Sequence, residues 1–360
     1  MVNIVQINAM RIGILLIVLS VCFQLNAQPK KEVEGRYVLV IHGGAGTILR
    51  SQRTAELEKK YTASLEQALA VGQSILEKGG KAIDAVEATV RVLEDNPLFN
   101  AGKGAVFTHE GRNELDAAIM DGRTLEAGSV AGVTTIRNPI TAARAVMEKS
   151  QHVLLSGKGA EQFAKEQGIE IVDSSYFYTP ERWRSLQRAL ERDSLKQLKQ
   201  QASLFNLAEE NELIKKDRYG TVGAVALDME GNLAAATSTG GMNNKKWGRI
   251  GDAPIIGAGT YANNATVAIS CTGWGEYYIR LVMAKTISDQ IEYANRSLLE
   301  AADEMVMVRL PKLGGDGGLI AVDKSGNIAM PFCTEGMYRG YIKRENYKAP
   351  IQKEVAMFKD

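Results

Sequence analysis

The residues Tyr-Gly-Thr-Val-Gly at 219–223, followed by the apolar run Ala-Val-Ala-Leu at 224–227, mark the point around which the rest of this chain is organised. The chain before them is charged, and the apolar run after them predicts a buried strand. A threonine that opens a strand is ordinarily just a β-branched strand residue. The glycine before it, however, allows backbone conformations closed to other residues, so the Thr221 hydroxyl could attack the Gly220 carbonyl and cut the chain.

Such a cut would make Thr221 a new N-terminus and would change its chemistry. A free α-amine has a pKa of about 7.7 to 8.0, so deprotonating it at pH 7 costs roughly 1 kcal/mol, against about 4.6 kcal/mol for a lysine. One residue would then hold both the nucleophile and the base. The local sequence permits this, and the wider chain has to decide.

The composition bounds the fold and the partners. A chain of 360 residues with 45% hydrophobic content can bury a large core, as one sizeable domain or two smaller ones. Its 43 Lys and Arg residues nearly balance 42 Asp and Glu, so no net charge favours nucleic acid or an anionic membrane as a partner. The 35 glycines predict many tight turns and close backbone approaches.

The N-terminus predicts an export signal. Arg11 precedes the apolar run at 12–19, and Leu-Asn-Ala at 25–27 offers a small residue before a cut at Gln28. A buried first helix or a membrane anchor is the alternative, but the run is short for a span of about 20 residues. We therefore expect a signal peptide over residues 1–27, a periplasmic location and no stable membrane span.

The three cysteines add two further expectations. Cys22 closes Leu-Ser-Val-Cys at 19–22, which loosely resembles a lipoprotein cleavage box, although Val21 is bulky where a small residue is expected. Cys271 and Cys333 could pair in an oxidising compartment. Two cysteines make no disulfide framework, however, so buried free thiols are the expected state.

Apolar periodicity predicts helices and strands in pairs, without the strict β-α-β alternation of a parallel sheet. Helices are expected over 54–76, 81–93, 139–149 and 160–167, from about 276 to 286, and over 297–310. Strands are expected over 37–41, 105–108, 114–120, 128–136, 152–156, 221–227, 233–238, 267–272, 319–323 and 327–331.

Two segments between these elements are unusual. The first strand runs into His-Gly-Gly-Ala-Gly-Thr at 42–47, a glycine-rich loop whose amides are predicted to face a ligand, with a plain turn as the alternative. No Gly-Lys-Ser/Thr follows, which excludes a P-loop. Residues 181–218 contain no glycine and are dense in Arg, Lys, Glu and Gln, which predicts a solvated helix or a mobile linker, exposed rather than core.

The polar residues exclude several chemistries. His42, His109 and His152 are the only histidines, so a Ser-His-Asp or Cys-His site has little to draw on, and each is simplest as a structural residue. No His-Glu-x-x-His or Cys-x-x-Cys metal pattern occurs. Gly-Ala-Gly-Thr-Tyr-Ala at 257–262 fits a dinucleotide fingerprint, but a strand rather than a helix follows it, which argues against that function.

A set of hydroxyls remains. Thr239 closes Thr-Ser-Thr at 237–239, and Thr272 precedes Gly273. If these strand ends meet at one edge of a sheet, both lie near Thr221, where one hydroxyl can orient the amine and a hydroxyl with a backbone N–H can hold an oxyanion. Taken singly, each threonine is an ordinary strand residue.

Arg249 and Asp252 lie on a glycine-flexed loop, Gly-Arg-Ile-Gly-Asp at 248–252. A guanidinium binds a carboxylate and a carboxylate binds an ammonium group, so this pair suits an amino-acid zwitterion. A surface ion pair is the alternative.

Together these stretches resemble the plant-type asparaginase and isoaspartyl peptidase family of N-terminal-nucleophile hydrolases. The resemblance runs from about Val38 to Arg339 and rests on matches, in order, at 42–47, 96–107, 115–122, 220–228, 237–243, 248–261 with Asn263, and 272–276.

The resemblance implies an α/β fold of one structural domain, a four-layer αββα sandwich with two mainly antiparallel sheets between helical layers. It implies autocleavage between Gly220 and Thr221. An α subunit of residues 28–220, with a mobile linker over about 177–220, and a β subunit of residues 221–360 would then assemble as two α and two β chains.

The resemblance also implies roles for the residues of the site. Thr221 would be the nucleophile and its amine the base, supported by the Thr239 hydroxyl, with Thr272 and Gly273 as the oxyanion site. Asn100 would lie near the scissile bond.

The implied substrate-binding residues form two short segments. They are Arg249, Ile250, Gly251 and Asp252, and Thr272, Gly273, Trp274 and Gly275. Arg249 and Asp252 would clamp the α-carboxylate and the α-amine, and Gly275 would line the pocket. Trp274 stands where the asparaginase branch usually has a small residue, so we expect it to narrow the pocket mouth or change the substrate preference.

No cofactor is implied except a structural sodium ion. In relatives the corresponding loop binds sodium through backbone carbonyls, which here would be those of Leu93, Glu94, Phe99, Ala101 and Lys103.

The leading interpretation is therefore an exported amidohydrolase that releases L-aspartate from β-aspartyl dipeptides and L-asparagine through a β-aspartyl-enzyme on Thr221. A glycosylasparaginase, which cuts the link between asparagine and N-acetylglucosamine, is the alternative within the family. The intact sequences at 42–46 and 96–104 favour the asparaginase branch. From a different class, the chain could be an exported binding protein that stays uncut.

Overall fold

The structure, a computed structural model, describes residues 35–201 and 220–359. The expected signal peptide, Cys22 and residues 202–219 of the expected linker lie outside these ranges. The described residues belong to one compact unit. Within the described ranges, no helix combines the length and the apolar character that crossing a membrane requires.

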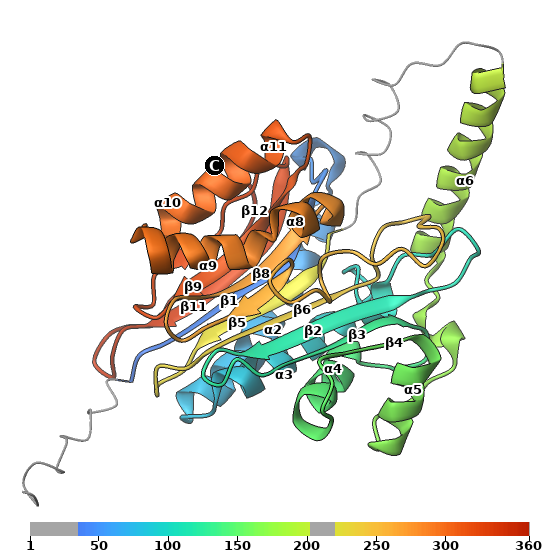
Figure 1. The fold of residues 1–360 in the computed structure, drawn as a ribbon. Coiled ribbons are helices and arrows are strands. Elements are labelled where there is room, and N and C mark those ends of the chain that lie inside the picture. The colour runs from blue at the N-terminus through green and yellow to red at the C-terminus, as the bar shows by residue number, and fades with distance from the viewer. Residues whose placement is uncertain (1–34, 202–219, 360) are drawn as a thin grey trace, which may run out of the picture. The chain divides into compact units, whose positions relative to one another are not determined.

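The described strands form two sheets (Figure 1). The large sheet has eight strands, in the order β12 (Gln352–Phe358), β11 (Gly336–Arg344), β1 (Tyr37–Gly46), β5 (Val222–Leu227), β6 (Leu233–Thr239), β2 (Leu115–Asp121), β3 (Ala127–Val133) and β4 (Leu154–Ser156). The small sheet has four, in the order β10 (Ile328–Ala329), β9 (Gly317–Asp323), β8 (Val267–Gly273) and β7 (Thr260–Ala262). Every pairing is antiparallel except that of β3 with β4, so the expectation of two mainly antiparallel sheets is confirmed.

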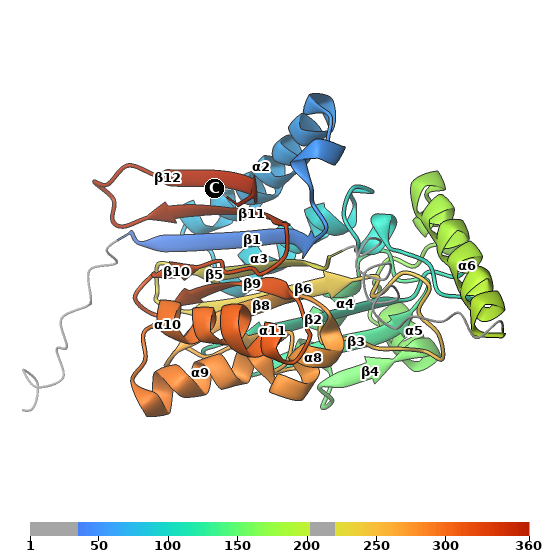
Figure 2. The same ribbon diagram turned by 90° about the horizontal axis from the view of Figure 1, so that it is seen from above.

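Helices cover the outer face of each sheet, and the two sheets pack against each other (Figures 1 and 2). The large sheet is covered by α2 (Ala55–Glu77), α3 (Ala82–Glu94), α4 (Pro139–Lys149) and α5 (Gly157–Glu166). The small sheet is covered by α8 (Gly275–Leu281), α9 (Met283–Ala294) and α10 (Leu298–Asp303), which continues through a π-helical turn (Glu304–Arg309) into α11 (Leu310–Lys312). Short 3-10 turns occupy Arg50–Gln52, Gly102–Gly104 and Ser174–Phe177.

Strand β1 shows why the sequence folds into layers. All ten of its residues are buried, and its side chains alternate between two cores. Tyr37, Leu39 and Ile41 pack with the helices α2 and α3, whereas Val38 and Val40 pack between the sheets. Burying one such aliphatic side chain contributes about 1.5–3 kcal/mol. A strand buried on both faces has a continuous apolar sequence rather than an alternating one, and residues 37–41 have that pattern.

The glycine-rich segment at 42–47 is mostly strand rather than loop, which corrects the sequence-based expectation. β1 continues to Gly46 because β11 pairs with it as far as Gly336, with a register shift between His42 and Gly44. Its other neighbour, β5, pairs only up to His42. The last residues of β1 therefore run past the start of β5, and their edge faces the point where Thr221 lies.

Other predicted elements differ in detail. The strand expected over 105–108 does not form a ladder, because side chains satisfy its backbone: the Asn100 Oδ1 accepts from the Val106 amide at 3.0 Å, and the Asn113 amide donates to the Ala105 carbonyl at 2.9 Å. The helix expected to end near residue 286 breaks at Val282, which adopts the left-handed conformation. Strands β7, β11 and β12 were not predicted.

Helix α6 (Pro180–Gln201) confirms the helical alternative for the charged segment but corrects its expected exposure. Four positions at helical spacing are buried, namely Arg182, Ser185, Leu186 and Ala189. The Arg182 guanidinium donates to the Gly104 carbonyl at 2.8 Å and to the Leu98 carbonyl at 3.0 Å. The first turns of α6 are thus fastened to the loop before β2.

Cys271 and Cys333 are free thiols, as expected.

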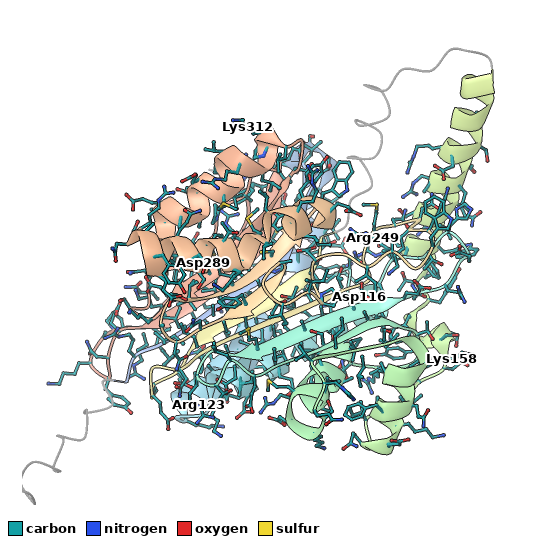
Figure 3. All side chains as sticks on the ribbon, viewed as in Figure 1. Asp116, Arg123, Lys158, Arg249, Asp289 and Lys312 are labelled. Carbon is teal, nitrogen blue, oxygen red and sulfur yellow. The ribbon has the colours of Figure 1, made fainter. Side chains whose placement is uncertain are left out.

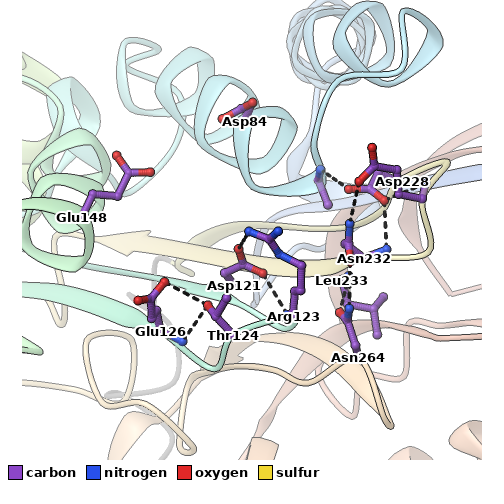
Figure 4. A network of polar contacts seen from close by, with 12 residues as sticks. Asp84, Asp121, Arg123, Thr124, Glu126, Glu148, Asp228, Asn232, Leu233 and Asn264 are labelled. Atoms are coloured by element: carbon purple, nitrogen blue, oxygen red, sulfur yellow. Dashed lines mark hydrogen bonds and ion pairs between the residues drawn. The ribbon is translucent and has the colours of Figure 1, made fainter.

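The turn after β5 lies at the end of that strand away from Thr221, and it also bonds to the first residue of α3 (Figure 4). The Asp228 carboxylate accepts from the amides of Glu230 and Asn232 at 3.0 and 2.9 Å, and from the amide of Ala82 at 2.9 Å. An acidic group at a helix N-terminus satisfies an unpaired amide and complements the helix dipole. The turn that follows β5 is in this way bonded to the helix that covers it, which fixes the strand that carries Thr221.

Candidate active site

The three threonines singled out by the sequence come together at one end of the sheets. Thr221 precedes β5 and Thr239 ends the neighbouring antiparallel strand β6, so the start of one strand lies beside the end of the other. The Thr221 Oγ1 donates to the Thr239 Oγ1 at 3.1 Å, and the Thr221 backbone N donates to the Thr272 Oγ1 at 3.1 Å. Thr272 reaches this point from β8 in the small sheet. All three residues are buried.

The Thr272 hydroxyl is oriented by its neighbours. It accepts from the Thr221 amide and also from the Ala45 amide, each at 3.1 Å. A hydroxyl has two acceptor positions and one proton. Because both acceptor positions are occupied, the proton of Thr272 is directed elsewhere and can serve as a donor. Ala45 lies on the free edge of β1, so the prediction that amides of this glycine-rich stretch face the site holds for Ala45.

His42 belongs to the site, although the sequence suggested only a structural role. Burial lowers the pKa of His42 to about 3, so its imidazole is neutral and carries a single N–H. Its Nδ1 lies 2.9 Å from the Thr221 carbonyl oxygen, which can only accept, so the proton is on Nδ1. The Nε2 atom, 2.9 Å from the Ser270 Oγ, must then accept from that hydroxyl.

This assignment sets the direction of a buried chain of hydroxyls. Ser270 donates to His42, so Ser270 accepts from Thr237 at 2.7 Å, and Thr237 accepts from Thr260 at 2.6 Å. Through His42, this series of hydrogen bonds holds the Thr221 carbonyl oxygen in place. Gly223 makes room for it, because a Cβ there would lie 1.9 Å from the Ser270 Oγ.

Two glycine backbones touch where the cut is predicted. Gly44 has a φ of +112°, and a Cβ on it would lie 2.7 Å from the Gly220 Cα. A Cβ on Gly220 would lie 2.3 Å from the Gly44 Cα. Neither position can carry a side chain without moving the backbone, so the Gly220–Thr221 peptide is pressed against β1.

Arg249 and Asp252, on the loop after β6, line the same pocket as Thr221 and Thr239; Asp252 is buried and Arg249 is half-buried. Arg249 forms its ion pair with Glu276 rather than with Asp252. Its Nε and Nη2 donate to the two carboxylate oxygens of Glu276, at 2.9 and 2.8 Å, which leaves Nη1 outside this pair. Gly251 and Gly275 give the guanidinium its space, since a Cβ on either would lie within 3 Å of an Arg249 nitrogen. Burial opposes the charge of Arg249, but the Glu276 carboxylate outweighs it and the pKa of Arg249 is raised.

Asp252 is buried with one oxygen unpaired. Its Oδ2 has no hydrogen-bond partner within the described ranges, and desolvation raises its pKa to about 7, although Arg249 acts in the opposite direction. An unpaired buried carboxylate oxygen in a pocket is suited to a cationic ligand, because leaving it unsatisfied costs free energy. Arg249 and Asp252 thus present opposite charges to the same space.

Asp116 and Lys245 are buried charged residues near Arg249; Asp116 and Arg249 are labelled in Figure 3. Burial raises the pKa of Asp116, which pairs with Thr239 across β2 and β6, and Lys245 opposes that shift. Burial also lowers the pKa of Lys245, whose Nζ donates to the Glu114 carbonyl at 2.9 Å. The contacts of Lys245 thus hold the loop between β6 and Arg249 against the start of β2.

A pocket of about 570 Å³, including its open mouth, collects these groups. Its lining contains Ala45, Gly46, Gly220, Thr221, Thr239, Gly241, Met242, Asn243, Arg249, Gly251, Asp252, Gly273, Trp274 and Asp316. Three predicted binding residues are absent from this lining: the Ile250 side chain is 40% exposed, Thr272 is fully buried behind Thr221, and Gly275 packs behind Asp252. Trp274 lies at the pocket, as expected for a residue that narrows its mouth, and stacks edge-on with Tyr277.

Asn100 lies close to the site and contacts the two glycines that follow Thr239. Its side chain donates to the Gly241 carbonyl at 2.8 Å, and its carbonyl accepts from the Gly240 amide at 3.0 Å. It therefore holds the glycine pair after Thr239, and its predicted place beside the scissile bond remains a prediction.

The loop after α3 is compatible with the predicted sodium ion. A Cβ on Gly102 would lie 2.3 Å from the Glu94 carbonyl oxygen, and one on Gly104 would lie 2.0 Å from that of Phe99. The loop is thus wrapped tightly with these carbonyls turned inward, the ligand type that a hard cation takes. The described residues contain no cluster of three or more His, Cys, Asp or Glu side chains that could hold a metal.

Several residues of the site were not found from the sequence. Glu276, Ser270 and Asp116 carry no motif of their own, and a polar residue inside a predicted strand is the only signal that the latter two give. Glu276 follows the Gly-Trp-Gly segment directly, so its position after a glycine-flexed turn could have placed it near Arg249.

Comparison with known proteins agrees with this geometry. Residues 35–351 match the family model described as asparaginase. The chain is 52% identical to isoaspartyl peptidase of Escherichia coli K12 over 85% of this chain and 93% of that protein. It is 51% identical to putative isoaspartyl peptidase/L-asparaginase of Dictyostelium discoideum (86% and 94% covered) and 44% identical to plant-type L-asparaginase of Pyrococcus horikoshii (85% and 96% covered). The chain therefore belongs to the asparaginase family that includes the isoaspartyl peptidases and plant-type L-asparaginases.

Proposed function

We propose that this chain is a self-cleaving threonine hydrolase that releases L-aspartate from β-aspartyl dipeptides and from L-asparagine. The observation that carries the proposal is the position of Thr221. Its N and Oγ1 atoms each meet a buried threonine hydroxyl, in a pocket that also presents Arg249 and Asp252. The names of the relatives, isoaspartyl peptidase and L-asparaginase, support the same activity.

The order of the layers supports the N-terminal-nucleophile sandwich implied by the resemblance. Helices, large sheet, small sheet and helices follow one another, and the predicted cut lies at the entry to a central strand of the large sheet. After the cut, the α subunit of residues 28–220 and the β subunit of residues 221–360 stay together because β1 and β2 of the first flank β5 and β6 of the second. We propose that two such αβ units assemble.

Self-cleavage would begin with attack of the Thr221 Oγ1 on the Gly220 carbonyl carbon. The new C–O bond replaces the C–N bond, and the hydroxyl proton moves to the nitrogen, so the peptide becomes an ester. Water then hydrolyses the ester to the Gly220 carboxylate and the Thr221 hydroxyl. Contact with Gly44 on one side, and the hydrogen bond from the Thr221 N to Thr272 on the other, support this geometry.

Turnover would reuse the same hydroxyl. The freed amine accepts the Oγ1 proton as the oxygen attacks the β-carbonyl carbon of the substrate, and then gives that proton to the departing amine. The Thr272 hydroxyl and the Gly273 amide would stabilise the negative oxygen of the intermediate. Water hydrolyses the resulting β-aspartyl ester and releases L-aspartate. The Thr239 hydroxyl keeps Oγ1 directed at the substrate.

The charges of the pocket explain a preference for β-linked substrates. With the α-carboxylate at Arg249 and the α-ammonium at Asp252, both groups on the substrate α-carbon are held. Only the side-chain carbonyl remains to reach Thr221. A peptide linked in the ordinary way through the α-carboxyl lacks the free carboxylate that Arg249 would bind.

A sodium ion would be held by the carbonyls of Leu93, Glu94, Phe99, Ala101 and Lys103. It would stiffen the loop that bears Asn100 and would take no part in bond making.

Removing the nucleophile gives the first prediction. Thr221→Ala should stay as one chain on a denaturing gel and should show no turnover of β-Asp-Leu above background, because both reactions need the hydroxyl. Thr221→Ser, which keeps a hydroxyl, should still be cut and retain partial activity. Cleavage at 220/221 in the alanine variant would count against the assignment, and turnover by that variant would indicate another nucleophile. A parent chain that stays uncut and shows no turnover would favour the binding-protein alternative.

Substrate comparison separates this function from glycosylasparaginase. We expect hydrolysis of β-Asp-Leu and L-asparagine, with little release from N-acetylglucosaminyl-asparagine, because the bulky Trp274 side chain lines the pocket. Measuring kcat/KM for the three compounds with one preparation decides this. Exclusive hydrolysis of the sugar conjugate would overturn the proposal in favour of glycosylasparaginase.

The raised pKa of Asp252 predicts a difference between two pH profiles. Binding the substrate ammonium needs the ionised carboxylate, so kcat/KM should fall as the pH drops through about 7. The free Thr221 amine, with a pKa near 7.7–8.0, becomes protonated over a similar pH range and then no longer acts as the base. In the enzyme–substrate complex the substrate ammonium keeps Asp252 ionised, so only the amine titrates. On the acid side, the plot of log kcat against pH should therefore have a slope of about one, and that of log kcat/KM a slope of about two. Equal slopes would contradict this, and Asp252→Asn should raise KM and reduce the kcat/KM slope to that of kcat.

We further propose that the protein is exported to the periplasm, which rests on the signal sequence at residues 1–27. The larger mature fragment should begin at Gln28 when the full gene is expressed in a Gram-negative host and the periplasmic fraction is sequenced. A cytoplasmic fragment that begins at Met1 would refute export, and a lipid-modified Cys22 at its start would show the lipoprotein alternative instead.

A further inference from the structure

Tyr278 does not line the pocket, but it contacts the backbone of the segment that does. It belongs to α8, which begins directly after the pocket segment, and its side chain is fully buried. Its hydroxyl lies 3.2 Å from the Thr272 carbonyl oxygen and 3.1 Å from the Gly318 carbonyl oxygen. Thr272 and Gly318 are paired across β8 and β9. One tyrosine proton is therefore shared between two carbonyls at the end of this strand pair.

The Thr272 carbonyl and the Gly273 N–H belong to the same peptide group. A trans peptide is planar, and its C=O and N–H point in opposite directions. A donor that holds the Thr272 oxygen on one side therefore sets the direction of the Gly273 hydrogen on the other. Tyr278 can control that amide without touching it.

Glycines create the space in which Tyr278 makes this contact. A Cβ on Gly317 would lie 2.4 Å from both the Tyr278 hydroxyl oxygen and the Thr272 carbonyl oxygen. A Cβ on Gly273 would lie 2.9 Å from the Tyr278 ring and 2.4 Å from the Asp316 carbonyl oxygen. Gly273 and Gly317 face each other in the ladder, so the strand pair lacks side chains where the tyrosine packs.

The Thr272 side chain at the end of β8 is held by the Thr221 and Ala45 amides, and the backbone at this end is paired on one side only. β7 pairs with β8 only from Ala268 to Ser270, two residues short of Thr272. Beyond that point, β9 is the neighbouring strand of β8 within the described ranges. Burial raises the pKa of Tyr278 well above its usual value, so the hydroxyl remains protonated and a donor at every working pH.

We propose that Tyr278 is a positioning residue for the oxyanion site, acting through the Thr272–Gly273 peptide. Its hydroxyl fixes the plane of that peptide, so that the Gly273 N–H stays aimed at the place where the negative oxygen develops. The inference rests on the proposed role of Gly273 in turnover. Removing an oxyanion donor outright costs about 10²–10³ in kcat, and loosening one should cost less, on the order of tenfold.

Tyr278→Phe tests this with the ring contacts kept. Tyr37→Phe is the matched control, because Tyr37 is also fully buried and donates through its hydroxyl, to Glu77 at 2.9 Å, at the start of β1. Both variants should be cut into two fragments and purified in that form. We expect kcat for β-Asp-Leu to fall about tenfold in Tyr278→Phe, with KM and the inhibition constant of L-aspartate within about twofold of the parent. Tyr37→Phe should keep all three constants.

Three results would overturn the proposal. These are a kcat for Tyr278→Phe within twofold of the parent, a parallel change in KM and the L-aspartate constant that signals general disruption, or an equal loss in Tyr37→Phe. If Tyr278→Phe does not yield soluble protein, Gly317→Ala tests the same contact by displacing the hydroxyl, and full kcat in that variant would overturn the proposal as well. An inactive Thr221→Ala beside a fully active Tyr278→Phe would refute only this inference, whereas an active Thr221→Ala would refute the proposed function itself.

Discussion

The contact between two glycine backbones, Gly44 in β1 and Gly220 before β5, determines where the nucleophile lies. A Cβ at Gly220 would lie 2.3 Å from the Gly44 Cα, so a side chain at this position would force the two strands apart. Because β1 extends past the start of β5, its edge forms a wall against which the peptide before Thr221 is held. The hydroxyls of Thr239 and Thr272 accept hydrogen bonds from the Thr221 Oγ1 and N. The position of the nucleophile thus follows from backbone packing in the large sheet and from one threonine hydroxyl of each sheet.

Burial of charge is the second constraint, and it prepares the site for a zwitterion. Glu276 holds two nitrogens of Arg249, so the guanidinium keeps its charge and its direction although it is mostly buried. Asp252 has an unpaired oxygen and a pKa raised by desolvation to about 7, so a bound cation stabilises its ionised form. His42, by contrast, is neutral, donates one hydrogen bond to the Thr221 carbonyl and accepts another from Ser270. Arg249 thus has its partner within the protein, whereas Asp252 keeps one oxygen unpaired in the pocket.

Much of this could be predicted from the sequence, and the failures have physical reasons. Continuous apolar runs and helical spacing located β1, β5, α2 and α3, because local pattern records which faces are buried. The segment at 42–47 was expected to be a loop, since its strand pairing depends on β11, nearly 300 residues away. The buried stripe of α6 was hidden by its many charges. Thr221, Thr239 and Thr272 were found because they end strands, whereas Glu276 and Tyr278 act through contacts that no local pattern records.

The central claim is that the working protein begins its catalytic chain at Thr221. N-terminal sequencing of protein that is fully active on β-Asp-Leu tests this most directly. The account predicts a fragment whose first residues are Thr-Val-Gly-Ala-Val, present in amounts equal to the active sites titrated in the same sample. A fully active preparation in which the Gly220–Thr221 bond is intact would contradict it.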